Sequence, residues 1–481
     1  MFKLNIKYVG TAKLNITCFL NFFWFSIILI LYVIDYFVGD VFDLIKIIFS
    51  IWFLNNTFLA FKHYGFFSVY TIFLLLNLFF IYDAILLDVF NYSKLDNFLI
   101  ITFPKKYRYS IDVGKNFILY SSTYLFILDI SIRYFKNNFL VSKRMSFIKE
   151  SDNKFANDFC FFLLLLIFPV SLYRSYQIFM YIWKQGYVYY ILNGLPAEAV
   201  SSWTNGAMGL FYVFFLVLVI NPINKNKFKI TCILCGFIFF LQGLSGGRGG
   251  FLYHFFALII VYLSFFSTKK ISIKTILFLI LLCLAFSLFV GQTREQTNKN
   301  TMNLFFNNNI ILDFLASQTN SRAVPLTVIQ GNIPFHEKPF IFSPLFDLFY
   351  NNDSASRFEM IKSTNSIDLL TCYKISKTHT LSGNGLGGAV IGEFIDCGSY
   401  FGVVGWTIIL ALIIYFLDNF DKISSRYRPL CFIFLVNLIH APRGYFFPNP
   451  LQLKYVLFAL VLYYLFVYIN RTFVKTKYLI G

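Results

Sequence analysis

The chain reads HTLSGNGLGGAVIGEFIDCGSYFGVVGW from His379 to Trp406. This stretch joins the one long polar segment of the chain, roughly residues 291–395, to the last hydrophobic runs. Glycine recurs along it, at Gly383, Gly385, Gly387, Gly388, Gly392, Gly398, Gly402 and Gly405. Glycine adopts positive φ and lets backbones approach closely. We therefore expect the stretch to turn tightly and to lie against a ligand or another helix.

The rest of the 481-residue chain is strongly hydrophobic. Apolar residues make up 58% and charged residues 13%, against about 45–50% and about 25% in soluble domains. The composition predicts an all-α polytopic membrane protein. A net charge of +18 would indicate nucleic-acid binding in a soluble chain, but in a membrane protein basic residues are interpreted by their place in the topology. We therefore expect membrane lipid, and no nucleic acid, as a partner.

Twelve hydrophobic runs are close to membrane-spanning length. They are residues 19–34, 42–61, 66–87, 117–130, 159–182, 206–220, 230–244, 251–266, 275–290, 400–417, 429–440 and 451–469. Nine runs precede the polar segment and three follow it. We therefore predict transmembrane helices in residues 1–290, a long and partly helical outer loop in residues 291–398, and transmembrane helices in residues 399–481.

Basic residues set the predicted orientation. Lysines precede the first run, at Lys3, Lys7 and Lys13, and favour a cytoplasmic N-terminus. Later basic clusters then also lie on the cytoplasmic side, at residues 133–154, 225–229, 269–274, 422–428 and 471–477. The C-terminus is then cytoplasmic and the polar segment lies outside. Lys105, Lys106 and Arg108 lie outside against this rule, which indicates either an anion-facing patch or an error in the topology.

Arginines at the outer ends of predicted spans are candidates for binding an anion. Arg248 lies within SGGRGG (residues 245–250), and bared backbone N–H groups beside an arginine are typical of a phosphate-binding nest. Arg294 and Arg443 lie at other outer ends, and Arg322 and Arg357 lie in the polar segment. Guanidinium groups suit phosphate oxygens. The alternative is that each arginine anchors a helix end at lipid headgroups or forms a local salt bridge.

Three residues are candidates for a catalytic base. His379 precedes the glycines and has an ordinary pKa near neutrality, although a loop histidine is often simply solvated. Glu393 and Asp396 lie on a predicted helix entering the membrane, where burial would raise a carboxyl pKa. Alternatively, they complement the helix dipole. No metal-binding or nucleotide-binding motif is present, so we expect no metal and no cofactor. Cys372 and Cys397 share the outer segment, where a disulfide would be able to form.

These features resemble one family, the O-antigen polymerase (Wzy) type of oligosaccharide repeat-unit polymerase, related to the O-antigen ligases. The resemblance rests on about twelve spans, the glycine-rich turn at Arg248 and the large late outer loop. Within that loop, Ser354-Ala-Ser-Arg357 precedes a predicted helix, and the glycines from Gly383 to Gly388 and from Gly398 to Gly402 lead into the next span. In the ligases a histidine follows the glycine-rich turn. Here His379 precedes that turn, which favours Glu393 as the base.

The resemblance implies a GT-C-like glycosyltransferase in the bacterial inner membrane with a periplasmic active site. Its substrate would be oligosaccharide linked to undecaprenyl diphosphate, which it would polymerise into O-antigen. A chain-length regulator protein would be a further partner. Two alternatives stay open, an O-antigen ligase or other lipid-linked glycosyltransferase, and a flippase of the same lipid-linked units. The long outer loop and the late glycines favour the polymerase over the flippase.

Overall fold

The computed structural model describes residues 5–6, 16–90, 98–101, 106–140, 150–186, 190, 201–245, 248–266, 319–346, 357–382 and 385–480, and short pieces between 274 and 290. In these residues the regular secondary structure is helical apart from four two-residue strands. Nine of the described helices are long and apolar enough to cross a membrane. The prediction of an all-α polytopic membrane protein is confirmed.

Nine of the twelve predicted spans coincide with these helices. They are α1 (Ile16–Val38), α2 (Phe42–Tyr64), the continuous run of α3 (Val69–Asn77), η1 (Leu78–Tyr82) and α4 (Asp83–Val89), α6 (Glu150–Gln185), α8 (Ser202–Ile220), α9 (Lys225–Leu244), α10 (Arg248–Phe266), α19 (Ser399–Asp418) and α21 (Leu453–Ile480). Within the third span, η1 is a π-helical turn. Such turns locally widen a helix and occur frequently at functional sites.

The other three predicted spans differ from the prediction or lie partly outside the described residues. The run 117–130 lies within α5 (Ile111–Asn138), a longer helix that also carries charged residues. The run 429–440 lies in α20 (Arg428–His440). Its 13 residues extend about 20 Å, short of a hydrocarbon core about 30 Å thick. The run 275–290 is described only in part.

The chain divides into two compact units. Unit 1 comprises residues 1–141, 305–418 and 437–448, and unit 2 comprises residues 142–304, 419–436 and 449–481. Both units draw on segments from before and after the long polar segment.

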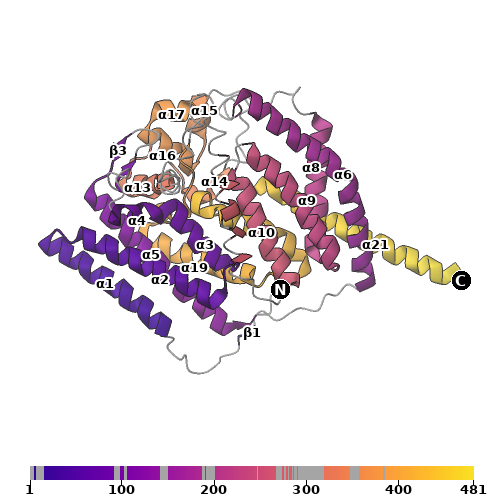
Figure 1. Cartoon of the computed structure of the whole chain (residues 1–481), viewed down its shortest axis with the longest axis horizontal. Coiled ribbons are helices and arrows are strands. Elements are labelled where there is room, and N and C mark those ends of the chain that lie inside the picture. Colours follow the sequence, from indigo (N-terminus) through magenta and orange to yellow (C-terminus); the bar gives the residue numbers. More distant parts are fainter. Residues whose placement is uncertain are drawn as a thin grey trace. The chain divides into compact units, whose positions relative to one another are not determined.

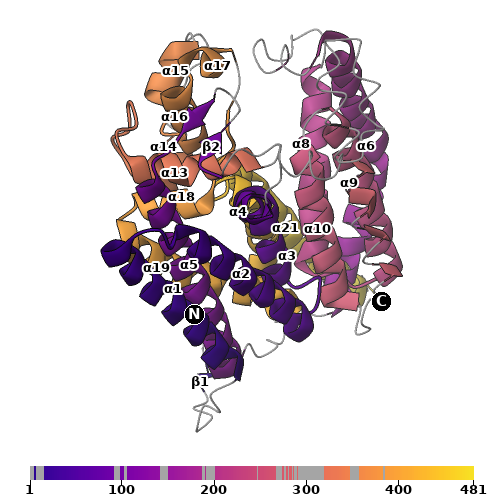
Figure 2. The ribbon, with the colours of Figure 1, turned by 60° about the vertical axis from the view of Figure 1, so that its left-hand side comes forward.

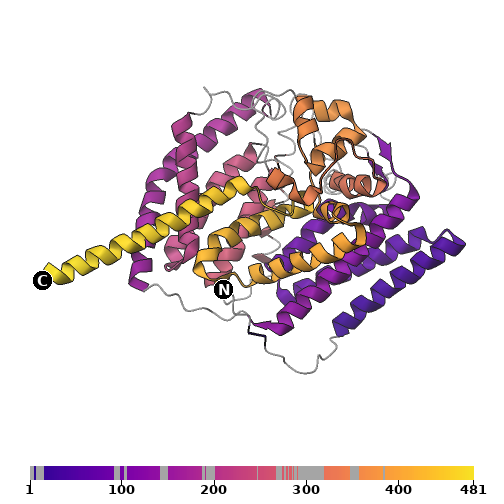
Figure 3. The ribbon, with the colours of Figure 1, turned by 180° about the vertical axis from the view of Figure 1, so that it is seen from behind.

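In unit 1, the long helices α1, α2, α5 and α19 lie side by side with α3 (Figure 1, Figure 3). Short helices gather at one end of them (Figure 2). The short elements are η3 (Thr319–Arg322), α13 (Ala323–Gln330), η4 (Phe340–Phe342), α14 (Ser343–Phe346), α15 (Arg357–Ser363), α16 (Ile367–Ile375), α17 (Lys377–Leu381), α18 (Val390–Asp396) and η8 (Ala441–Arg443). Strands β2 (Ile100–Ile101) and β3 (Tyr107–Arg108) pair antiparallel, as do β1 (Asn5–Ile6) and β4 (Phe139–Leu140).

Unit 2 packs α6, α8, α9, α10 and α21 together with three short turns, η6 (Phe420–Lys422), η7 (Ser425–Tyr427) and η9 (Pro450–Gln452). Arg428 at the start of α20 is buried and satisfies backbone carbonyls from two segments. Its guanidinium donates to the oxygens of Ile220 at 2.8 Å, Asp421 at 2.8 Å and Ile423 at 3.0 Å. This arginine therefore caps the end of α8 and fixes the turn that leads into α20.

A buried polar network joins four helices of unit 1. The Asp129 carboxylate on α5 accepts hydrogen bonds from Arg133 Nε at 2.6 Å, from Tyr70 on α3 at 3.1 Å and from the Asn21 amide on α1. Trp52 on α2 donates to the same Asn21 at 2.9 Å. A buried charge is tolerated when it is paired and hydrogen-bonded. Asp129 thus fixes α1, α2 and α3 against α5.

Replacing this carboxylate is expected to destabilise the protein. Asp129→Ala removes the acceptor shared by three donors and the anion beside Arg133, a change that costs about 3–5 kcal/mol in buried pairs. Tyr70→Phe removes one 3.1 Å hydrogen bond, worth about 1 kcal/mol. Thermal unfolding of the detergent-purified protein measures both variants. Equal losses of melting temperature in the two variants would contradict the central role of Asp129.

Candidate functional site

The glycine stretch passes between two turns that come from distant parts of the chain. The Ser321 hydroxyl of η3 donates to the carbonyl oxygen of Leu386 at 3.5 Å. Gly387 has a φ of +79°, and a Cβ there would lie 3.0 Å from Cγ of Arg443 in η8. The expectation of a tight turn against another segment is confirmed at these residues.

The closest approach is between Gly388 and Gly444. A Cβ on Gly388 would lie 2.6 Å from the carbonyl oxygen of Gly444, a distance that real Cβ atoms do not reach. Two backbones are therefore in direct contact at this point. The contact positions α18, which begins two residues after Gly388, against the segment that follows η8.

Glu393 lies in this junction and is fully buried. Its Oε2 accepts a hydrogen bond from the backbone N–H of Phe446 at 2.9 Å. Its Oε1 has no hydrogen-bond partner among the described residues. Burial raises the pKa of this carboxyl well above its ordinary value of 4.5, the Phe446 N–H opposes that rise, and Asp396 and Asp368 add to it. The surroundings of Glu393 therefore favour its neutral form.

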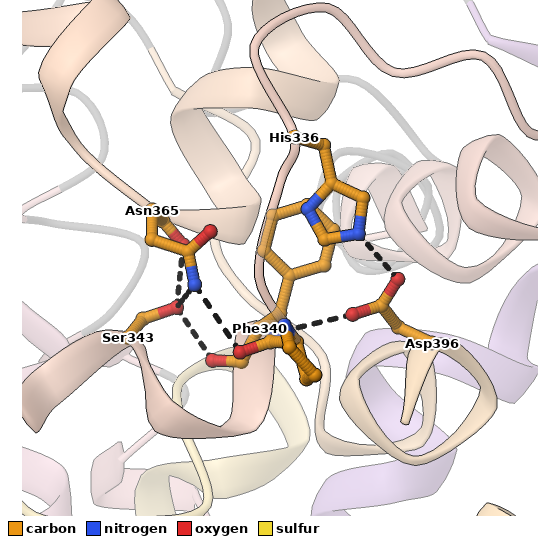
Figure 4. A network of polar contacts seen from close by, with 6 residues as sticks. His336, Phe340, Ser343, Asn365 and Asp396 are labelled. Carbon is orange, nitrogen blue, oxygen red and sulfur yellow. Dashed lines mark hydrogen bonds and ion pairs between the residues drawn. The ribbon is translucent and has the colours of Figure 1, made fainter. Parts of the chain in front are cut away.

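Asp396, one turn further along α18, binds a histidine (Figure 4). Its Oδ1 lies 2.7 Å from Nε2 of His336, and its Oδ2 accepts from the backbone N–H of Phe340 at 2.9 Å. The imidazole also stacks on the Phe340 ring, with centroids 4.0 Å apart. Both side chains retain some exposure, 23% for His336 and 10% for Asp396.

A second carboxylate of the outer segment makes polar contacts with the turn after η8. Asp368 Oδ1 accepts from the Tyr445 hydroxyl at 2.7 Å and from the Ser366 hydroxyl. The amide of Asn437 donates to the carbonyl oxygens of Tyr445 and Phe446 at 2.9 and 2.7 Å. The turn that contacts Glu393 is thus fixed by side chains on both of its sides.

The predicted arginines lie in different surroundings. Arg443 is half-buried, and its guanidinium lies 5.4 Å from the ring centroid of Phe80 on the π-helical turn η1. Arg322 is buried and donates to the carbonyl oxygens of Phe98 at 2.8 Å and Ile100 at 2.9 Å. Burial lowers the Arg322 pKa to about 10, while Asp83 favours its charged form. The structure thus gives Arg322 a role in holding the strand β2 to η3.

The remaining predicted residues are not brought into this junction by any contact of the described residues. Arg357 begins α15 and donates to the Thr380 carbonyl oxygen at 3.4 Å. His379 on α17 is half-buried, with Nδ1 3.5 Å from the Ser376 hydroxyl. Arg248 begins α10 in unit 2, and its side chain lies outside the described residues, as does the whole of Arg294. Cys372 and Cys397 do not form a disulfide with each other.

Two residues of the site had no signal in the sequence. His336 lies in an irregular segment without a motif, and Tyr445 follows the predicted Arg443 as one of many tyrosines. Their roles depend on contacts with α18 and α16, which connect residues far apart in the chain.

The assembled site contains the groups that group transfer onto a hydroxyl requires. The guanidinium of Arg443 lies beside the glycine stretch, and a guanidinium suits an anionic leaving group. Glu393 and Asp396 lie one turn apart on α18, and His336 contacts Asp396, and such groups accept or hold protons.

The contact between Gly388 and Gly444 leads to a testable expectation. Gly388→Ala places a methyl group against the backbone carbonyl of Gly444. A backbone carbonyl cannot rotate away as a side chain can, and overpacking of this kind costs about 1–3 kcal/mol. The matched control is Gly405→Ala in α19, where an added Cβ meets nothing within 4 Å. We expect a lower melting temperature in Gly388→Ala only. Indistinguishable melting temperatures would argue against the close contact.

The raised pKa of Glu393 predicts a pH dependence of stability. Since burial raises the folded-state pKa, the stabilisation is complete below the unfolded value of 4.5 and is lost as the pH rises through the folded value. Glu393→Gln keeps an acceptor for the Phe446 N–H and cannot ionise. We therefore expect the melting temperature of Glu393→Gln to fall less than that of the wild type between about pH 5 and about pH 9. Parallel curves for the two proteins would contradict a raised pKa of Glu393.

Comparison with known proteins identifies the family. The chain matches the family model described as O-antigen polysaccharide polymerase Wzy over residues 19–477. No curated protein and no solved structure matches the chain. Because the family match extends over nearly the whole sequence, this multi-pass membrane protein belongs to the O-antigen polysaccharide polymerase Wzy family.

Proposed function

We propose that this protein polymerises oligosaccharide repeat units carried on undecaprenyl diphosphate, at the periplasmic face of the bacterial inner membrane. Membership of the Wzy family supports an O-antigen polymerase role. Within the site, one observation supports the proposal most strongly, the packing of the glycine stretch against Arg443 at Gly387. That arrangement places a cation beside the glycine stretch, where a diphosphate would bind.

In the proposed reaction, an acceptor hydroxyl on a new repeat unit attacks the anomeric carbon of the growing chain. The new glycosidic carbon–oxygen bond forms as the bond to the diphosphate oxygen breaks, and undecaprenyl diphosphate leaves with the electron pair. The proton of the acceptor hydroxyl passes to a base. A cation at the leaving group lowers the barrier by neutralising the charge that develops there.

Arg443 is the arginine that we place at the diphosphate. It is half-buried, so its charge is less screened than at an open surface. Its guanidinium adjoins the aromatic ring of Phe80, and its side chain adjoins the glycine stretch. Arg248 and Arg294 remain predictions for the same role, and Arg357 and Arg322 for a supporting one. The contacts of Arg322 favour a structural role.

The cellular test is gel analysis of surface lipopolysaccharide from a strain that lacks this gene. We expect core bearing a single repeat unit, with long chains restored by the wild-type gene. Core without any repeat unit would instead indicate the ligase or the flippase. Accumulation of unflipped or unligated lipid-linked units would then distinguish those two.

Arg443 is tested in the same strain. We expect Arg443→Ala to reduce chain extension by about 10²–10³, the effect of losing one donor to a developing anion. We expect Arg443→Lys to restore part of the activity by supplying the charge without the planar fork. The control is Arg426→Ala on η7, which removes the same charge on the predicted cytoplasmic side. Normal chain length in Arg443→Ala, with normal membrane insertion, would exclude Arg443 from the diphosphate site.

A further inference from the structure

The side chains of His336 and Asp396 are held by more contacts than those of a typical surface ion pair. Both carboxylate oxygens of Asp396 are used, one by His336 Nε2 at 2.7 Å and one by the Phe340 N–H at 2.9 Å. The carboxylate therefore has one orientation. Since it accepts from Nε2, the hydrogen of a neutral imidazole lies on Nε2, and Nδ1 keeps its lone pair.

The orientation of the His336 ring is fixed as well. The ring stacks on that of Phe340 with an angle of 19° between the two planes. Phe340 is itself held by the turn around it, where the Asn365 amide donates to the Pro339 carbonyl oxygen at 3.2 Å and to the Ser343 hydroxyl at 3.3 Å (Figure 4). A histidine held in one tautomer and one orientation is the arrangement that proton transfer requires.

Nδ1 of His336 makes no hydrogen bond among the described residues and is enclosed. An enclosed acceptor without a partner costs about 1–3 kcal/mol. A hydroxyl donating to Nδ1 would remove this cost. The structure therefore leaves one nitrogen of an oriented imidazole available for a hydroxyl of a ligand.

This pair adjoins the site that holds Glu393. Asp396 lies three residues after Glu393 on α18, about 4.5 Å along the helix axis. Glu393 itself is fully buried, and burial raises its pKa and favours the neutral carboxyl, which is a poor proton acceptor. His336 has 23% of its side chain exposed, although its Nδ1 is enclosed in this structure. Of these two groups, only the histidine has an exposed part from which a substrate can approach.

We propose that His336 is the general base of chain extension and that Asp396 is its positioning residue. This inference rests on the proposed function. Nδ1 accepts the proton of the acceptor hydroxyl as its oxygen bonds to the anomeric carbon, and the diphosphate leaves with the electron pair. The imidazolium then carries the proton beside the Asp396 carboxylate and releases it to water. The substrate class is thus an acceptor sugar with a free hydroxyl.

Charged groups near the ring come from several elements. Asp396 and Glu393 lie on α18, and Glu337 and Lys338 lie on the loop of His336 itself. Lys374 of α16 donates to the carbonyl oxygen of Gly331, at the start of the same loop. The Asp396 carboxylate, whose Oδ1 lies 2.7 Å from Nε2, contacts the ring directly.

The test uses the full-length protein in vesicles of phosphatidylethanolamine and phosphatidylglycerol. The substrate is the lipid-linked single repeat unit extracted from the deletion strain, and the readouts are kcat and KM for chain extension. His336→Gln preserves a donor for Asp396, and we expect its kcat to be about 10²–10⁴ lower than that of the wild type.

Asp396→Asn and an exposed histidine complete the experiment. Asp396→Asn removes the carboxylate that orients the ring, so we expect it to lower kcat with little change in KM, and we expect Asp396→Glu, which keeps a carboxylate, to restore part of kcat. His63→Gln, at the exposed end of α2, is the matched control and should behave as wild type. A merely structural pair would lower the melting temperature of Asp396→Asn without lowering kcat selectively.

One result would overturn the inference without affecting the proposed function, namely a wild-type rate in a folded His336→Gln. A loss of activity in His379→Gln would then move the base to His379. Failure of the wild type itself to extend these units, in vesicles where it is folded, would overturn the proposed function and the role of His336 with it.

Discussion

The site depends on a backbone contact between Gly388 and Gly444 that leaves no room for a side chain. It fixes the start of α18 against the turn after η8. Glu393 then meets the Phe446 N–H, and Asp396 points to the loop that carries His336. One steric constraint thus brings together three segments of the chain. Side-chain hydrogen bonds add orientation to an arrangement that the backbone has already set.

Burial gives the two carboxyl groups of α18 different environments. Glu393 is enclosed and accepts a hydrogen bond from a backbone N–H through one oxygen, and burial raises its pKa and favours a neutral carboxyl at the centre of the junction. Asp396 has a cationic or neutral imidazole as its partner and keeps partial exposure. Neighbouring carboxyl groups with different environments are typical of sites that separate structural and proton-transfer roles.

The class of fold could be predicted from the sequence because a lipid bilayer requires long apolar helices. Nine of the twelve hydrophobic runs form such helices. The run that forms α20 is apolar, but the helix is too short to cross a membrane. The glycine stretch and Arg443 were predicted, and they are in contact. His336 was missed because a single histidine in an irregular loop carries no periodicity. The pairing with Asp396 exists only in three dimensions. Arg322 was predicted to contact a ligand. No sequence pattern indicated that it would instead donate to the carbonyl oxygens of Phe98 and Ile100.

The fraction of each membrane helix that is buried within the protein affects which substitutions the sequence tolerates. In α1 only 17% of the most apolar window is buried within the protein, and in α10 and α21 the share is 28%. Lipid tails are as apolar as leucine, so a lipid-facing position accepts many hydrophobic residues equally. Substitutions are then tolerated at most lipid-facing positions, whereas the residues in close contact near α18 tolerate few. Related proteins of this kind are then expected to share the order of their hydrophobic and polar segments more than the identity of individual residues. The family model recognises residues 19–477 although no individual curated sequence aligns with them.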